Sequence, residues 1–251
     1  MIDQELFHNL HHEYMTGLRT AGGIGTLSEK TIHAVLKDCM DSNPDHQEQP
    51  FGQYIADIYD GSAVVEIQTR SFDRLRGKLS CFLEKVPVTI VHPVAATKYI
   101  TVIDPDTGEI ISRRKSPKKG RPCDVMKELY RIKMFLDDPN LFIHLIFIDV
   151  DEYREKYTGP KRGRYNKKNP TTRIEQIPIR IADEITLDSP GDYLKFIPDG
   201  LPGIFSSKDL AKAAHVTVST AQTTLNILFH VGVIDKVGKE KNLILYRIKE
   251  M

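Results

Sequence analysis

Apolar residues in the first 40 positions recur at the spacing of two helices. The first stripe runs through residues 3–18 and ends at a turn with three glycines in four positions. The second begins after Thr26 and Glu29, whose spacing is typical of a capping box, and ends near Met40. The pattern predicts a leading helix with a Gly-rich turn over residues 1–25, followed by a second helix.

Alternating and continuous apolar runs predict strands over the next hundred residues. Residues 54–59 and 63–69 flank Asp60-Gly61, a dipeptide typical of a hairpin turn. Further strands are predicted over residues 88–91, 99–103, 109–112 and 141–150, and helices with one apolar face over residues 71–82 and 124–136. This order predicts an α/β fold over residues 26–150, with a three-layer core and a mixed sheet.

Beyond this region the periodic signals weaken and then change. Residues 151–200 are polar and basic, with one predicted strand over residues 174–181 that Pro178 interrupts. Residues 201–251 again show regular signals in a compact tail. We therefore expect a basic bridging segment followed by a second, small domain.

Composition limits the class of protein. The 251 residues are 40% hydrophobic, which excludes a disordered or fibrous chain, and the formal net charge of +1 excludes a global field toward nucleic acid or membrane. Three cysteines are too few for a disulfide framework or a four-thiolate zinc site. No apolar run approaches the ~18 residues of a membrane span, and the N-terminus lacks a signal-peptide layout. We expect a cytoplasmic protein with no membrane partner.

Positive charge is instead concentrated locally. Residues 1–50 hold three Lys/Arg and eight Asp/Glu, which leaves 32 basic and 26 acidic residues in the rest of the chain. Two runs rich in Gly and Pro carry much of it: Arg113, Arg114, Lys115, Lys118, Lys119 and Arg121, and Lys161, Arg162, Arg164, Lys167, Lys168 and Arg173. Either run alone is explained by a solvated loop. Two such loops beside a suitable site favour a phosphate-binding surface.

The predicted hairpin carries three polar side chains on one face. Because side chains alternate along a strand, Glu66 and Gln68 share a face, and Asp57 of the preceding strand faces the same side. Two neighbouring carboxylates suit a hard divalent cation, magnesium rather than zinc. The alternative is that they are ordinary polar residues on a solvated hairpin face.

Here the sequence resembles the restriction-endonuclease-like nuclease superfamily. Its signature is an Asp followed, on the next strand, by Glu/Asp-x-Lys; Asp57 and Glu66 match the acids, and Gln68 stands where the family usually has Lys. The resemblance implies that the two acids hold magnesium, with manganese as the alternative. It also implies that Gln68 orients water and that Glu29 is an outer or second-metal acid. If the domain is inactive, no cofactor is expected.

Basic residues follow the second acidic strand directly. Arg70, Arg74, Arg76 and Lys78 lie where the superfamily often places groups that touch phosphates of the cleaved strand. A solvated helix face is the alternative.

The tail resembles a winged-helix domain over residues 204–248. Ser206 or Ser207 caps a short predicted helix, and Gly232 ends a second one that is followed by a basic hairpin. The side chains expected to face outward on the second helix are Ser219, Thr220, Gln222, Thr223 and Asn226, with Lys236, Lys239 and Lys241 on the hairpin. Such groups suit base edges and phosphates of DNA. The alternative is a module for protein contact, including a homodimer.

Together these features predict a DNA-binding protein with a magnesium-dependent nuclease domain that hydrolyses phosphodiesters. The alternative is a non-catalytic winged-helix transcriptional regulator whose nuclease-like part survives as a scaffold. A third hypothesis is a protein-interaction adaptor, which would not retain DNA even at low salt.

Overall fold

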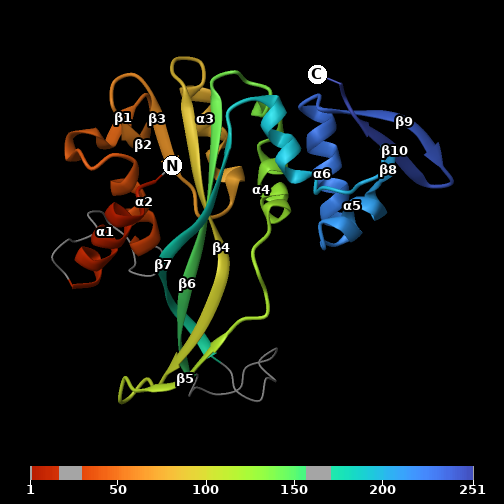
Figure 1. Ribbon diagram of the computed structural model, residues 1–251. Coiled ribbons are helices and arrows are strands. Elements are labelled where there is room, and N and C mark those ends of the chain that lie inside the picture. The colour runs from red at the N-terminus through yellow and green to blue at the C-terminus, as the bar shows by residue number, and fades with distance from the viewer. Residues whose placement is uncertain (1, 17–29, 157–170, 251) are drawn as a thin grey trace. The chain divides into compact units, whose positions relative to one another are not determined.

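The chain is an α/β protein with one large mixed sheet and one small sheet (Figure 1). The computed structural model describes residues 2–16, 30–156 and 171–250. The described α-helices are α1 (Gln4–Thr16), α2 (Lys30–Met40), α3 (Arg76–Phe82), α4 (Met126–Arg131), α5 (Ser207–Ala213) and α6 (Val218–His230). The strands are β1 (Gln47–Phe51), β2 (Tyr54–Tyr59), β3 (Val64–Ile67), β4 (Val88–Ile103), β5 (Ile110–Lys115), β6 (Leu141–Lys156), β7 (Thr171–Leu187), β8 (Phe205–Ser206), β9 (Ile234–Glu240) and β10 (Leu243–Ile248). The predicted α/β class is confirmed.

The large sheet has the order β1-β2-β3-β4-β6-β7, with β5 paired to β4, and the small sheet has the order β8-β10-β9. Short 3-10 helices complete the chain: η2 (Pro44–His46), η3 (Phe72–Leu75), η4 (Pro122–Val125), η5 (Lys133–Phe135) and η6 (Pro190–Phe196). None of the helices in the described residues is both long and apolar enough to cross a membrane.

The chain divides into two compact units, each assembled from three stretches. The first unit comprises Met1–Pro44, Pro93–Gly120 and Ile146–Glu184, and the second unit comprises Asp45–His92, Arg121–Leu145 and Ile185–Met251. The units interleave along the sequence, whereas the predicted segments follow one another. The predicted boundaries near residues 25, 150 and 200 stay predictions.

In the first unit, α1 packs against α2. Phe7 and Leu10 of α1 are buried, three residues apart on one helix face, and the Tyr14 hydroxyl donates to Asp38 of α2 at 2.6 Å. The apolar side of the predicted first helix therefore packs against the second helix.

The part of strand β6 that belongs to the first unit buries charged side chains. Asp151 accepts a hydrogen bond from the Thr101 hydroxyl at 2.7 Å and pairs with Arg113 of β5 at 2.8 Å. Glu152 pairs with Lys98 of β4 at 2.7 Å. Because a buried carboxylate without a partner is costly, these cations compensate for the burial of the acids.

The second unit holds the predicted hairpin. β1 pairs with β2 and β2 with β3 in antiparallel fashion, while β3 pairs with β4 in parallel. Helix α3 connects the two parallel strands, and its Phe82 packs edge-to-face on Phe51 and Tyr54, with ring centroids 4.9 and 6.1 Å apart. Gly77 permits the approach of Tyr54, because a Cβ at this position would lie 2.4 Å from the Tyr54 hydroxyl.

The tail of the second unit follows the predicted order of helix, turn, helix and hairpin. Ser206 caps α5 by accepting a hydrogen bond from the Lys208 amide at 3.2 Å, and Gly232 follows α6 with a φ of 80°. Both predicted helix ends are confirmed. Helix α6 packs on α5 and also on α4, which lies beside it in Figure 1.

Two strands differ from the prediction. Residues 47–51 form β1, although Pro50 and the polar residues before it predict no strand. β1 is at the end of the sheet order, and an edge strand tolerates a proline and polar side chains. Residues 88–91 and 99–103 belong to one strand, β4, instead of two. Pro93 lies outside the residues of β4 that pair with β3 and with β5, so neither pairing loses an amide donor to it.

Gly120→Ala is expected to destabilise the protein. A Cβ at Gly120 would lie 2.3 Å from the Ala95 carbonyl oxygen, so the backbone must shift, at a cost of about 1–3 kcal/mol. The free energy of unfolding, measured by urea titration, would fall by this amount. The control is Gly203→Ala, where the Cβ meets nothing within 4 Å and a change below about 0.5 kcal/mol is expected. Equal stability of the two variants would contradict the prediction.

Candidate functional site

Asp57 and Glu66 meet where strands β2 and β3 separate. The backbone pairs are Ile58 with Val65 and Tyr59 with Val64. One position further, backbone amides donate to side chains: the Asp57 amide donates to Glu66 Oε1 at 3.3 Å, and the Ile67 amide donates to Asp57 Oδ2 at 2.8 Å. These contacts bring the two acids together, and their common face on the hairpin stays a prediction.

The Glu66 side chain is buried together with a cation. The residue is 2% exposed, and Lys78 Nζ of helix α3 lies 2.9 and 2.8 Å from its two carboxylate oxygens. Burial, and then the negative charge of Asp57, raise the pKa of Glu66 to about 7, whereas Lys78 acts in the opposite direction. The site is therefore a cluster of two acids and one lysine.

Lys78 is the residue whose role the sequence did not reveal. Its place among Arg74 and Arg76 favours a solvated basic helix face. The structure instead turns Lys78 toward the acids, twelve positions after Glu66. One feature of the sequence could have suggested this role: Gln68 stands where the nuclease superfamily usually has a lysine, so a lysine from elsewhere in the chain could take its place.

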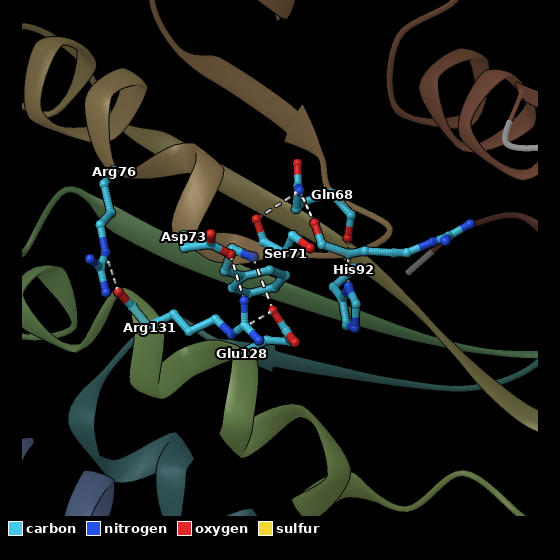
Figure 2. Close-up of polar contacts among 9 residues, drawn as sticks. Gln68, Ser71, Asp73, Arg76, His92, Glu128 and Arg131 are labelled. Atoms are coloured by element: carbon cyan, nitrogen blue, oxygen red, sulfur yellow. Dashed lines mark hydrogen bonds and ion pairs between the residues drawn. The ribbon is translucent and has the colours of Figure 1, made fainter. Parts of the chain in front are cut away.

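Gln68 forms hydrogen bonds with the turn that follows β3 and with His92. Its amide nitrogen donates to the carbonyl oxygens of Arg70 and Ser71, and Ser71 adopts a left-handed φ of 55° (Figure 2). The Gln68 carbonyl contacts His92 Nδ1 at 2.5 Å. Because a carbonyl oxygen only accepts, His92 Nδ1–H donates this bond. Burial lowers the pKa of His92. Gln68 therefore holds the turn that follows β3.

Helix α4 holds the other end of this turn. Glu128 Oε2 accepts a hydrogen bond from the Phe72 amide at 3.0 Å, and Arg131 pairs with Asp73 at 2.6 Å (Figure 2). The Arg76 side chain donates to the Arg131 carbonyl at 2.6 Å. The segment between Glu66 and Lys78 is thus fixed on both sides.

The residues predicted to contact phosphates have different surroundings. Arg70, Arg74 and Arg114 are exposed. Arg113 is half exposed but its charge is paired with the buried Asp151, and its guanidinium lies 4.6 Å from the Tyr99 ring centroid. Four predicted site residues lie outside the described residues: Glu29, Lys161, Arg162 and Arg164.

The predicted outward face of α6 needs one correction. Gln222 and Asn226 are exposed, and Thr223 is half buried. Lys239 of β9 and Lys241 of the turn between β9 and β10 are also exposed. Thr220 is only 5% exposed, so the expectation that it faces outward is wrong. It lies at the start of α6, where its amide donates to the Thr217 hydroxyl at 3.1 Å.

The donor set of the cluster fits a hard cation. Asp57 and Glu66 offer carboxylate oxygens from adjacent strands, and their mutual repulsion is of the kind that a divalent cation relieves. Within the part of the chain that is described, no group of three or more His, Cys, Asp or Glu side chains is arranged for a metal. Magnesium is commonly held by one or two carboxylates, with water and phosphate as further ligands, so the pair suffices.

Comparison with known proteins gives two matches. A family model with the description "Domain of unknown function (DUF8091)" matches residues 30–188. A relative from Treponema pallidum (strain Nichols), described as "Uncharacterized protein", is 27% identical over 225 residues, which cover 89% of this chain and 87% of the relative. No solved structure matches the chain. The matched family region contains Asp57, Glu66 and Lys78.

The raised pKa of Glu66 predicts a pH-dependent stability. The folded protein binds this proton more tightly than the unfolded chain, whose ordinary pKa is 4.5. The stabilisation is therefore complete below pH 4.5 and is lost as the pH rises through about 7. Between pH 4.5 and about 7 the free energy of unfolding of the wild type should therefore fall. In Glu66→Gln, which lacks this titrating group, the fall should be smaller by on the order of 2 kcal/mol.

The measurement is urea unfolding at a series of pH values. Glu84→Gln is the matched control, because Glu84 is an exposed glutamate of the same unit. It should keep the wild-type slope. A Glu66→Gln variant with the wild-type slope would show that Glu66 titrates normally.

Proposed function

This chain belongs to the family described as Domain of unknown function (DUF8091), and on the chemistry of its residues we propose that it is a DNA-binding protein with magnesium-dependent phosphodiesterase activity. The activity would reside in the second unit. Its cation would be magnesium or manganese, and its location the reducing cytoplasm.

The cluster of Asp57, Glu66 and Lys78 carries the proposal. Two acids on adjacent strands and a lysine are the groups that hydrolysis of a phosphodiester requires: ligands for a cation and a positive charge near the phosphate. The antiparallel, antiparallel, parallel pairing of β1 to β4, with α3 before β4, supports a restriction-endonuclease-like core. Lys78 would supply the charge that Gln68 lacks.

Each residue of the cluster has a task in this proposal. A bound magnesium ion would lower the pKa of water and offset the charge that grows on the phosphate. Asp57 and Glu66 would hold that ion, and Asp57 is kept in place by the Ile67 amide. Lys78 would move its ammonium from the Glu66 carboxylate toward a phosphate oxygen, a step that the flexible lysine stem permits.

Exposed arginines extend the proposed site. Arg70 and Arg74 follow Glu66 on the turn and helix that α4 fixes, so their stems start from a rigid backbone. Guanidinium groups pair with phosphate through two parallel hydrogen bonds. They would hold the DNA backbone without reading its sequence.

We assign the tail to a winged-helix module that binds DNA. The order β8, α5, α6, β9 and β10 supports this assignment, and Gln222 with Asn226 on α6 would face base edges. Lys239 and Lys241 would contact phosphate. Use of the same module for a homodimer is the alternative.

A non-catalytic regulator is the second candidate. The contact that favours it is the ion pair of Lys78 with Glu66, because an internal cation already compensates for burial of the carboxylate. In that protein the cluster would only stabilise the fold, and the tail would carry the function.

Magnesium-dependent nicking of supercoiled plasmid tests the proposal. We expect Asp57→Asn, Glu66→Gln and Lys78→Met each to lose about 100-fold or more of the wild-type rate, because each removes a cation ligand or a charge at the phosphate. Glu84→Gln, the exposed control, should nick at the wild-type rate. Circular dichroism and thermal melting establish that each variant is folded.

Two outcomes would contradict the proposal. Wild-type protein that binds DNA but does not nick it with magnesium or manganese would favour the regulator. Nicking that persists unchanged in folded Glu66→Gln would mean that the cluster does not perform the reaction.

A further inference from the structure

Five side chains of the second unit form a continuous row across α4, η5, α6 and β9. Lys133 Nζ lies 5.7 Å from the Tyr130 ring centroid and donates to Asn226 Oδ1 at 2.8 Å. Asn226 and Phe229 are one turn apart on α6, and Lys236 Nζ lies 4.2 Å from the Phe229 ring centroid. We call this row, Tyr130, Lys133, Asn226, Phe229 and Lys236, the aromatic and lysine face.

The rings of this face are exposed although the rest of α6 is well packed. Tyr130 is 50% and Phe229 is 41% exposed, and the neighbouring Met134 is 57% exposed. The other sides of α6 are buried, through Ala221, Leu225 and Leu228 and through Thr220, Thr224 and Ile227. Asn226 and Phe229 therefore lie, with Gln222, on the exposed side of α6.

The chemistry of the face repeats one unit: an aromatic ring with an ammonium group above it. A nucleotide has the complementary pair, a flat base and a phosphate. Asn226 between the two units adds an amide that donates and accepts hydrogen bonds.

A single strand suits this face better than a duplex does. In a duplex the bases are stacked inside and offer only their edges in the grooves, so rings on a protein surface have nothing to stack on. Unpaired bases are free to stack on aromatic side chains, while lysines neutralise the backbone. An acidic peptide would use the lysines but would not need rings.

We propose that the aromatic and lysine face binds single-stranded nucleic acid, with bases stacked on Tyr130 and Phe229 and phosphates paired with Lys133 and Lys236. On binding, the Lys133 and Lys236 ammonium groups would move from the rings of Tyr130 and Phe229 to the phosphates. The ring faces would then be open to the bases. This binding is separate from hydrolysis at Asp57 and Glu66. It shares Asn226 with the proposed reading of duplex DNA by α6, but the two rings and the two lysines belong to the single-strand site alone.

Fluorescence anisotropy in EDTA tests the proposal with a labelled single strand that cannot fold back and with the duplex of the same length. Two double variants are compared: one removes both aromatic rings, and the other keeps both. Tyr130→Leu with Phe229→Leu keeps apolar area but removes stacking, whereas Tyr130→Phe with Phe229→Tyr keeps both rings. We expect the leucine pair to bind the single strand at least about tenfold more weakly, with little change for the duplex, and the ring-keeping pair to bind like the wild type.

The lysines give a second measurement. Lys133→Gln with Lys236→Gln should reduce the slope of log affinity against log salt for the single strand by about 0.7 per lysine, because fewer counterions are released. An unchanged slope would mean that these ammonium groups do not meet phosphates and would overturn the lysine part of the proposal.

Three outcomes would overturn the stacking. The leucine pair could bind the single strand as tightly as the wild type, or it could lose single strand and duplex equally. A poly-glutamate peptide could also compete as well as an unlabelled strand, which would assign the face to an acidic protein. Because EDTA removes the divalent cation that the nicking reaction requires, these results are independent of the nicking assay.

Discussion

Burial of the Glu66 carboxylate is the constraint around which the second unit is arranged. An ionised carboxylate in a closed apolar layer is costly unless charge and hydrogen bonds compensate for it. The compensation comes from two directions: the Asp57 amide on β2 and the Lys78 ammonium on α3. The register of the hairpin and the position of α3 along it must both be kept for these contacts to exist. Gly77, beside Lys78, allows the helix to approach Tyr54 closely enough.

Helix α4 connects two parts of the unit that are far apart in sequence. On one side Glu128 and Arg131 fix the turn that follows β3, and on the other Lys133, in the 3-10 helix that follows, bonds Asn226 of α6. A surface helix normally has one packed side and one solvated side. Here the polar side of α4 is also engaged. The carboxylate cluster and the tail therefore share one support.

Local features were predictable from the sequence, and features that depend on distant partners were not. The alternation of Asp57 and Glu66 with apolar neighbours predicted that the two acids meet, and Ser206 and Gly232 predicted helix ends, because each depends on a few adjacent residues. The ion pair of Lys78 was not predictable, since it requires α3 to pack over β3. Thr220 was misplaced because the burial of α6 depends on α4, η4 and η6, which are distant in sequence, as well as on α5, and the local pattern does not show these partners. β1 carried no apolar alternation, since an edge strand with polar neighbours does not need it.

The hydrogen bonds between β2 and β3 give the carboxylates a second role. At the end of this strand pair, two backbone amides, those of Asp57 and Ile67, donate hydrogen bonds to side-chain carboxylates. The carboxylate oxygens that accept these two hydrogen bonds are the same groups that would bind the proposed cation. A group that draws those oxygens away would therefore also take a hydrogen-bond acceptor from each of these two amides. Occupation of the site would weaken contacts at the end of the strand pair, and exchange of the two amide protons with solvent would report it.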